Sequence, residues 1–403
     1  MAGRADGGLT VAEPLSSQRR RGALVIGGDH VGLGIARSLG RRGIPVWVLD
    51  DELSIARASR YTQRALPWPR APRQQVDYLL ALRARHRLDG WLLYPTRDET
   101  AAVIAQHHDA LAAHYTLTTA PWPRLQYAYD KRLTYQLAAQ LGIAYPATRH
   151  GVAASDLPRL ALPFPLVLKP AIKHLFYRQT RDKAWRIDSP AELLARYRAA
   201  SALIEPSQIL LQELVPGPGA AQYSFGGLCW EGAVVASVVA RRLRQHPMDF
   251  GHASTFVETV EEPRVEAAAQ CWLAALRYSG VVEIEFKHDA RTNEFKLLDV
   301  NPRFWGWHTL AARAGVDLPY LQWLLATGRQ VPPRRARAGV RWMRLVTDLP
   351  TAAGEIVRGR LGVGAYLRTL RPPLQFSVLV PDDPAPALFE ALLLPYLVKQ
   401  RGF

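Results

Sequence analysis

Cysteine is scarce in this chain, which has two cysteines, Cys229 and Cys271, among 403 residues. Both lie in apolar stretches, and they are far apart in the sequence. Neither a disulfide framework nor a zinc site is therefore expected. The two thiols are predicted to be buried structural side chains in a protein of the reducing cytoplasm.

Long apolar runs are also absent. No stretch of about eighteen apolar residues occurs, so a membrane span is not predicted. The start, MAGRADGGLTVAEPLSSQRRRG, lacks the apolar core of a secretory signal, and residues 1–20 are expected to form a flexible tail. With 403 residues, of which 48% are hydrophobic, the chain is long enough for two or three domains.

Acidic residues are outnumbered, with 35 Asp and Glu against 51 Lys and Arg and a formal net charge of +16. Such a charge is typical of nucleic-acid binding. However, only seven of the basic residues are lysines, and the arginines are spread over the chain without a dense basic stripe. A nucleic-acid partner is therefore not expected, whereas an anionic small molecule such as a nucleotide agrees with the charge.

The first hundred ordered residues have the pattern of an open α/β domain. RGALVIGGDHVGLGIARSLGRRGIPVWVLDDE predicts a strand, a glycine loop, a helix and a second strand, and GWLLYPTRDET predicts a further strand that ends in polar residues. The glycine loop, with Asp50 downstream, suggests a dinucleotide site, and a dehydrogenase is one alternative. Its glycines do not follow the G-x-G-x-x-G spacing, which weakens that alternative.

The following two hundred residues mix helices and strands. PFPLVLKP, QILLQELV, GAVVASVVARRLRQ and the pair VVEIEFKHD and EFKLLDVN predict strands, and the pair is joined by ARTN, a hairpin turn. SPAELLARYRAA predicts a helix with Ser189 as its N-cap. This order predicts an α+β region after the α/β domain.

The predicted hairpin carries acids in an unusual arrangement. Because strands alternate their side chains, Glu283 and Glu285 share one face, and Asp299 and Asn301 share one face of the partner strand. Buried carboxylates repel one another, and a divalent cation would resolve the conflict. Oxygen ligands without His or Cys favour Mg²⁺ or Mn²⁺, and Arg303 would lie beside the phosphates of a bound ligand. The alternative is a solvent-exposed hairpin with ordinary surface acids.

Two of the seven lysines occupy informative places. Lys169 ends an apolar strand, and Lys131 opens a helix. An ammonium group at such a position is a compact point charge suited to phosphate. Taken alone, each is equally consistent with a solvated surface lysine.

Five motifs follow one another in order: YDK at 129–131, VLKP at 167–170, QELVPG at 212–217, EIEFK at 283–287 and LLDVNPR at 297–303. They resemble the ATP-grasp superfamily, in particular its carboxylate–amine (or carboxylate–thiol) ligases. The resemblance implies an α/β and α+β fold. In it, a small open α/β domain (residues 21–120) precedes an ATP-grasp fold of two α+β subdomains (121–330). Residues 331–403 would be a C-terminal extension of unknown role.

The resemblance also implies a nucleotide site. Lys131 and Lys169 would contact the phosphates or the adenine edge of ATP. Gln212, Glu213 and Val215 would lie beside adenine and act partly through their backbone.

The metal ligands implied by the resemblance are Glu285, Asp299 and Asn301, with Glu283 as the alternative carboxylate. Arg303 would act as a catalytic residue that contacts the terminal phosphate or the reacting acyl phosphate.

Two features depart from the resemblance. No acidic residue follows QELVPG to bind the ribose, so Gln222 is the substitute expected there. The loop after Lys169 is bulky and basic rather than rich in glycine, and its Lys173, His174, Arg178 and Lys183 would cover phosphate by charge or bind substrate.

A third basic segment, ARRLRQ, ends an apolar strand. Alternation places Arg242 and Arg244 on one face, where they would bind the substrate carboxylate and anchor the tetrahedral intermediate as catalytic residues. A solvated basic edge is the alternative.

Together these features predict a cytoplasmic ATP-dependent ligase that uses ATP and Mg²⁺ (or Mn²⁺). It would activate a carboxylate as an acyl phosphate and join it to an amine. Its partners would be these two small molecules, with a possible homodimer and no membrane. The alternatives are a biotin-dependent carboxylase and a nucleotide-binding module without turnover.

Overall fold

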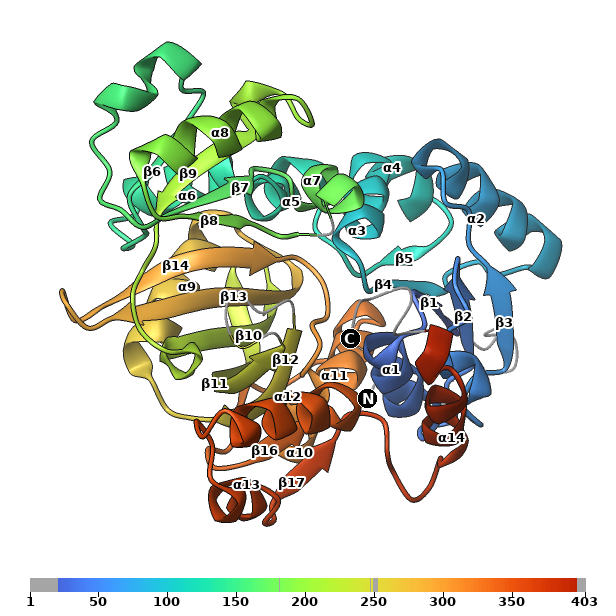
Figure 1. Ribbon diagram of the computed structural model, residues 1–403. Coiled ribbons are helices and arrows are strands. Elements are labelled where there is room, and N and C mark those ends of the chain that lie inside the picture. The colour runs from blue at the N-terminus through green and yellow to red at the C-terminus, as the bar shows by residue number, and fades with distance from the viewer. Residues whose placement is uncertain (1–20, 181, 247, 249–252, 397–403) are drawn as a thin grey trace, which may run out of the picture.

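The computed structural model describes residues 21–180, 182–246, 248 and 253–396. The predicted tail, residues 1–20, lies outside this range. The described residues form three sheets of five, eight and four strands, which Figure 1 shows.

The first sheet is parallel, with the strand order β3-β2-β1-β4-β5. Its strands are β1 (Ala23–Ile26), β2 (Val46–Asp50), β3 (Arg64–Pro67), β4 (Leu92–Pro95) and β5 (Thr116–Leu117). Its helices are α1 (His30–Gly40), α2 (Pro72–His86), α3 (Asp98–Gln106) and α4 (His108–Ala112). β1, β2 and β4 are fully buried, as apolar runs in a covered parallel sheet should be. The polar residues after β4 therefore lie at the carboxyl edge of this sheet.

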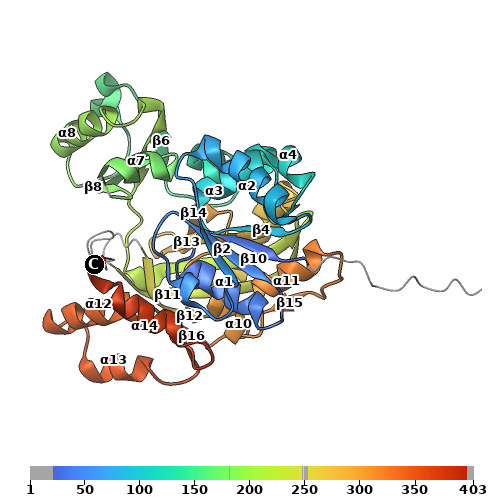
Figure 2. The same cartoon turned by 90° about the vertical axis from the view of Figure 1, so that its right-hand side faces the viewer.

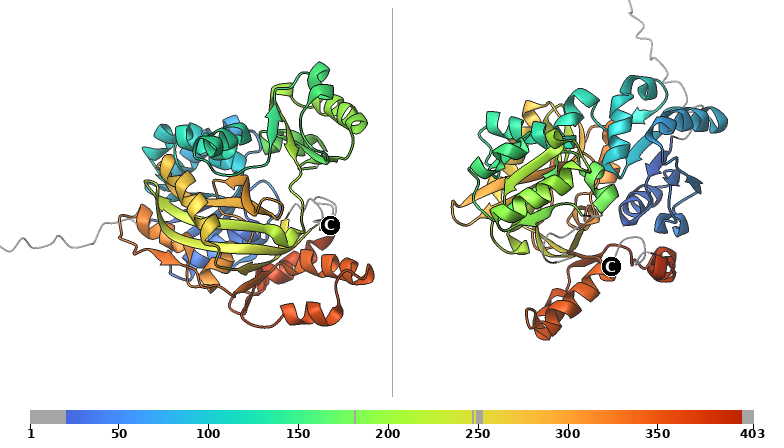
Figure 3. Two further views of the ribbon diagram at one scale, coloured as in Figure 1. Left: turned by 90° about the vertical axis from the view of Figure 1, so that its left-hand side faces the viewer. Right: turned by 45° about the horizontal axis from the view of Figure 1, so that its top comes forward.

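The four-stranded sheet, in the order β6-β9-β7-β8, forms a small lobe. It consists of β6 (Thr148–His150), β7 (Leu166–Pro170), α7 (Lys173–Thr180), β8 (Trp185–Ile187), α8 (Pro190–Ser201) and β9 (Ile209–Glu213). Ser189 caps α8 by accepting a hydrogen bond from the Glu192 amide at 3.3 Å, which confirms the predicted N-cap. The lobe has its own apolar core, and the left panel of Figure 3 shows it standing apart from the large sheet.

The eight-stranded sheet runs β14-β13-β10-β11-β12-β16-β17, and β15 pairs with β11. Its strands are β10 (Gln222–Trp230), β11 (Ala233–His246), β12 (Ala253–Thr259), β13 (Gly280–Asp289), β14 (Glu294–Asn301), β15 (Arg334–Arg335), β16 (Arg341–Met343) and β17 (Leu374–Phe376). The accompanying helices are α5 (Trp122–Tyr129), α6 (Lys131–Gln140), α9 (Pro263–Ala275), α10 (Thr309–Arg313) and α11 (Leu318–Ala326). The hairpin of β13 and β14 is confirmed.

The C-terminal residues are integrated into this architecture. β15, β16 and β17 belong to the large sheet. The same segment forms the helices α12 (Leu345–Val357), α13 (Val363–Thr369) and α14 (Ala385–Leu392), and α12 contacts β11 and β12. α14 reaches back to the N-terminal domain, where Arg37 forms a buried ion pair with Asp383 at 2.9 Å. Figures 1 and 2 show α14 beside α1. Residues 331–396 therefore connect the large sheet with the N-terminal domain.

Two further expectations concern surface and membrane. Cys229 is buried as predicted, but Cys271 is exposed, because it lies on the outer face of α9. None of the helices in the described ranges combines the length and the apolar character that crossing a bilayer requires.

Candidate active site

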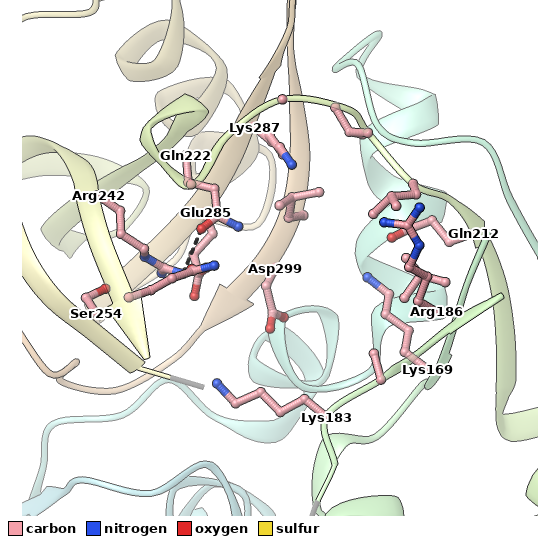
Figure 4. A pocket seen from close by; sticks show the side chains of 18 of the residues that line it. Lys169, Lys183, Arg186, Gln212, Gln222, Arg242, Ser254, Glu285, Lys287 and Asp299 are labelled. Atoms are coloured by element: carbon pink, nitrogen blue, oxygen red, sulfur yellow. Dashed lines mark hydrogen bonds and ion pairs between the residues drawn. The ribbon is translucent and has the colours of Figure 1, made fainter. Parts of the chain in front are cut away.

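A cavity of about 850 Å³ lies between the small lobe and the large sheet, and His30 of the N-terminal domain borders it. Figure 4 shows Lys169 and Gln212 on one wall, with Arg242, Glu285 and Asp299 facing them. Of the predicted site residues, all but Arg244 line this cavity: Lys131, Lys169, Gln212, Glu213, Val215, Gln222, Arg242, Glu283, Glu285, Asp299, Asn301 and Arg303. The fold thus gathers residues that are more than 170 positions apart in the sequence.

The hairpin presents its polar residues in direct cross-strand pairs. Glu285 lies opposite Asp299, and Glu283 lies opposite Asn301. The Asn301 amide group donates to Glu283 and to Glu285, each at 3.1 Å. The alternation read from the sequence therefore describes the register of this hairpin.

The protein's own cations balance the acids of the hairpin. The Lys131 ammonium donates to Asp299, and the Arg242 guanidinium donates to Glu285 at 3.0 Å. Burial raises the pKa of both carboxyl groups, yet Lys131 and Arg242 hold the pKa of Asp299 and of Glu285 below their ordinary values. These cations relieve the repulsion within the protein itself, so the repulsion alone does not require a divalent cation, and the predicted metal site stays a prediction.

Glu283 differs from the other two acids. Burial and the neighbouring Glu285 raise the pKa of Glu283 to about 7. One of its oxygens accepts a hydrogen bond from the Trp307 indole at 2.9 Å. Of the two candidate carboxylates, Glu285 is therefore the one held in its charged form.

The oxygen donors fit a magnesium ion only together with a bound phosphate. Within the described ranges, no three His, Cys, Asp or Glu side chains are grouped as a complete metal site. The cavity offers two charged carboxylates, Glu285 and Asp299, and the amide oxygen of Asn301. Mg²⁺ commonly takes one or two carboxylates and completes its shell with substrate phosphates and water. The donor set suits that mode of binding.

Lys169, at the end of β7, faces the hairpin across the cavity. Its ammonium donates to the Tyr135 hydroxyl at 2.8 Å. Burial and the positive charge of Lys131 lower the pKa of Lys169 to about 7. A polyanionic ligand placed here would restore the charged form of Lys169 and be held by it.

The end of β9 forms another part of the wall. Gln212 donates to the Thr148 hydroxyl at 2.7 Å, and Glu213 is bound by Lys296 at 3.2 Å and by Arg291. The side chains of Gln212 and Glu213 are thus engaged within the protein. The backbone of this segment, including that of Val215, is the part that a flat heterocycle would meet.

Arg242 and Arg244 of β11 do not share a face. Irregular register on both sides of Arg244 breaks the alternation between β11 and β12. Arg242 faces the cavity and binds both Gln222, at 2.9 Å, and Glu285. Arg244 is buried elsewhere, where both its bonds to Asp348 are 2.8 Å long. The expected pairing of the two arginines is therefore corrected, and Arg244 leaves the candidate catalytic set.

Arg303 is held from several directions. Its Nη1 donates to the Phe304 carbonyl at 2.9 Å, and its Nη2 donates to the Asn301 side-chain oxygen at 3.1 Å. The remaining partner, Asp98, comes from the N-terminal domain, and its Oδ1 lies 2.8 Å from Nε. Sequence reasoning missed Asp98 and Tyr135. The only signal for Asp98 is its place just after β4, at the carboxyl end of a parallel strand.

The basic loop after Lys169 contributes to the cavity. Lys173 and Lys183 line it, and burial and the charge of Lys173 lower the pKa of Lys183 to about 7. The side chains of His174 and Arg178 lie outside the described part of the chain. The cavity wall therefore carries several ammonium and guanidinium groups, which suits a ligand of high negative charge.

Comparison with known proteins agrees with this arrangement. Residues 205–346 match the family described as ATP-grasp in the biosynthetic pathway with Ter operon. A D-aspartate ligase of Enterococcus faecium (strain Aus0004) is 22% identical over 230 residues, which are 53% of each chain. The chain thus spans about half the length of this curated relative.

Solved structures share the fold at low sequence identity. An L-amino acid ligase from Bacillus licheniformis superposes with a TM-score of 0.62 at 16% identity, covering 78% of this chain and 76% of that one. The N5-carboxyaminoimidazole synthetase from Staphylococcus aureus complexed with ADP gives 0.64 at 15% identity, covering 85% and 87%.

The chain therefore has the fold of ATP-grasp enzymes, and residues 205–346 of it match an ATP-grasp family. The ligases among the similar proteins agree with the predicted resemblance to carboxylate–amine ligases. The predicted family resemblance and fold class are confirmed.

Proposed function

We propose that the protein is an ATP-dependent ligase that joins a small carboxylate to an amine. The arrangement of the cavity carries this proposal. Lys169 lies on the side of the cavity opposite Arg242, with Glu285 and Asp299 between them, and Lys131 pairs with Asp299. Such a site can hold a polyphosphate and a second anion together, which acyl phosphate formation requires.

In the proposed reaction, a carboxylate oxygen attacks the terminal phosphorus of ATP, and ADP leaves. The amine then attacks the acyl carbon, phosphate leaves, and the amide forms with loss of a proton. Lys131 and Lys169 hold the phosphates, and Arg303 neutralises charge on the transferred group. Arg242 binds the substrate carboxylate. Catalysis rests on positioning and charge neutralisation, without a covalent enzyme intermediate.

Glu285, Asp299 and Asn301 would hold a divalent cation, which would neutralise negative charge on the phosphates. The cation displaces no fold element, because the three side chains already face the cavity. With ligands bound, Lys131 would contact phosphate and Arg242 would contact the substrate carboxylate in place of Asp299 and Glu285. Asp299 and Glu285 would therefore be the partners of Lys131 and Arg242 only while no ligand is bound.

The names of two similar proteins support an amino acid as one substrate. One is a D-aspartate ligase and the other an L-amino acid ligase. Amino acids supply either the carboxylate or the amine of such a reaction. The first screen should therefore pair amino acids with one another and with other small carboxylates and amines.

The test is ADP release measured over this screen, with products identified by mass spectrometry. Asp299→Ala and Lys169→Ala should abolish Mg²⁺-dependent ADP release while leaving the fold intact. Asp156→Ala and Arg159→Ala, which change exposed residues far from the cavity, are matched controls and should keep full activity. Turnover at the wild-type rate in Asp299→Ala or Lys169→Ala would refute the site assignment. Release of ADP that depends on bicarbonate instead of an amine would point to a carboxylase.

A further inference from the structure

Asp98 brings the N-terminal domain into the active site. It is the first residue of α3, directly after the carboxyl end of β4. Neither strand of the acidic hairpin nor any ATP-grasp motif contains it, and its partners lie 75 and 205 residues further along the chain. In Figures 1 and 2, α3 lies beside α7 of the small lobe.

The loop that carries Asp98 is fixed by the core of its own domain. The Thr96 hydroxyl donates to the Ile26 carbonyl at 3.0 Å, which ties the loop to the end of β1. Arg97 donates to Asp50 at 2.8 Å and also pairs with Asp51, at the end of β2. Asp98 is therefore held in place independently of its contacts with the active site.

The Asp98 carboxylate binds two cations from two other parts of the protein. Its Oδ1 lies 2.8 Å from Arg303 Nε, and its Oδ2 accepts a hydrogen bond from Arg303 Nη2 at 3.1 Å. Oδ2 also lies 3.7 Å from the ammonium of Lys173, at the start of α7. The carboxylate thus joins the N-terminal domain, the large sheet and the small lobe at one point.

We propose that Asp98 is a positioning residue: it orients Arg303 toward the transferred phosphoryl group and draws Lys173 of the small lobe to the same end of the cavity. The inference rests on the proposed function. The Asn301 oxygen and the Phe304 carbonyl restrain one end of the guanidinium, and Asp98 restrains its Nε side. Fixing a side chain from several sides preorganises it for the charge that develops in the reaction.

The alternative is that Asp98 only balances charge. The two roles differ in the sign of one effect. A carboxylate near the phosphate site repels a nucleotide, so its removal should leave Mg-ATP affinity equal to or tighter than that of the wild type. If Asp98 also positions Arg303, the same change should slow the reaction. A fall in kcat without weaker nucleotide binding therefore separates positioning from both charge balance and misfolding.

The test compares Asp98→Asn with Glu99→Gln, which removes the same charge from the same first turn of α3 while leaving the Asp98 pairs with Arg303 and Lys173 in place. Asp98→Asn should lower kcat by about 10- to 100-fold, with KM for ATP unchanged or lower. Glu99→Gln should keep both constants. Equal kcat in Asp98→Asn and the wild type would overturn the inference, and so would a parallel loss of kcat and nucleotide affinity.

A double-mutant cycle with Arg303→Gln tests whether Asp98 acts through Arg303. Affinity for a non-hydrolysable Mg-ATP analogue, which needs no knowledge of the substrates, is the second readout. The effect of Asp98→Asn on kcat should vanish in the Arg303→Gln background, whereas the affinity should again be equal or tighter, because the repulsion between Asp98 and the nucleotide does not depend on Arg303. Additive effects on kcat would overturn the inference while leaving the proposed function standing. A wild-type protein that binds no magnesium nucleotide would instead overturn the proposed function on which the inference rests.

Discussion

At the scale of single residues, the active site is a set of charges that neutralise one another in pairs. Lys131 pairs with Asp299, Arg242 with Glu285, and Arg303 with Asp98. A buried charge without a partner would cost several kcal/mol. The pairing therefore explains how so many charged side chains can be buried around the cavity. The pairs also keep each group in its charged form, ready to meet a ligand of opposite charge.

His308 gives a prediction of pH dependence. This side chain is 1% exposed, its Nδ1 donates to the Trp305 carbonyl at 2.9 Å, and burial lowers the pKa of His308 to about 4 from the ordinary 6.5. The unfolded chain therefore binds the proton more tightly, and stability falls as the pH drops from 6.5 toward 4. The loss should reach about 3 kcal/mol. The measurement is the free energy of urea unfolding of the wild type and of His308→Gln across this range. The variant should show a shallower pH dependence, and equal slopes would contradict the prediction.

Residue-level prediction from sequence succeeded where local geometry decides. The period of two in a strand places Glu285 and Asp299 on facing positions, and the structure pairs them. It failed for Arg244, because no sequence signal announces the irregular register around it. Asp98 could not be predicted, since its partner Arg303 is 205 residues away and only the assembled fold brings them together.

At the scale of elements, one close packing contact fixes the position of the segment that carries Arg303. The Trp305 ring lies over Gly226 of β10, and a Cβ built there would be 2.1 Å from the nearest ring carbon. Gly226→Ala must therefore move Trp305, which also lines the cavity. The glycine gives the tryptophan room that an alanine would fill.

The expected cost of Gly226→Ala is about 1–3 kcal/mol, with weaker nucleotide binding. Gly364→Ala is the control, because its Cβ would meet only the end of the Arg368 side chain, at 3.9 Å. Gly364 is the second residue of α13, where alanine, a better helix former than glycine, should stabilise the protein slightly. Thermal unfolding of the two variants checks both statements, and an unchanged melting temperature for Gly226→Ala would be evidence against the packing argument.

Element prediction from sequence succeeded for α8, whose cap is encoded locally by Ser189, and for the hairpin of β13 and β14. It could not place residues 341–403. β16 and β17 are each three residues long. In the large sheet, β16 pairs with β12 on one side and with β17 on the other. Such short strands carry no periodicity, and only their partners define them. The predicted domain boundary at residue 330 therefore stays a prediction.

At the scale of the whole molecule, Asp383 binds the C-terminal segment to the N-terminal domain. This carboxylate is 1% exposed and binds the Arg37 guanidinium at 2.9 Å, the Ser59 hydroxyl at 2.7 Å and the Arg60 amide at 3.0 Å. Its loss would leave the buried Arg37 without a counter-ion. The contact therefore holds two ends of the described chain together.

Asp383→Ala should destabilise the protein by roughly 3–5 kcal/mol, the cost of breaking one side of a buried ion pair. The control is Asp382→Ala, which breaks the neighbouring pair with Arg41, whose side chains are 42% and 43% exposed. That pair should contribute less than about 1 kcal/mol. Urea unfolding of both variants gives the comparison. An equal loss of unfolding free energy in the two variants would show that Asp383 is not the main contact between the C-terminal segment and the N-terminal domain.

The central claim is that the cavity holds a magnesium-bound adenine nucleotide between the lysines and the acidic hairpin. The most direct measurement is thermal unfolding with Mg-ATP, with ATP and a chelator, and with NAD, for the wild type and for Asp299→Ala. At about 100 times the dissociation constant, Mg-ATP should stabilise the wild type by roughly 2.7 kcal/mol. The chelator and Asp299→Ala should each remove most of this effect. Stabilisation by NAD alone, or by ATP to the same extent without magnesium and without Asp299, would contradict the account.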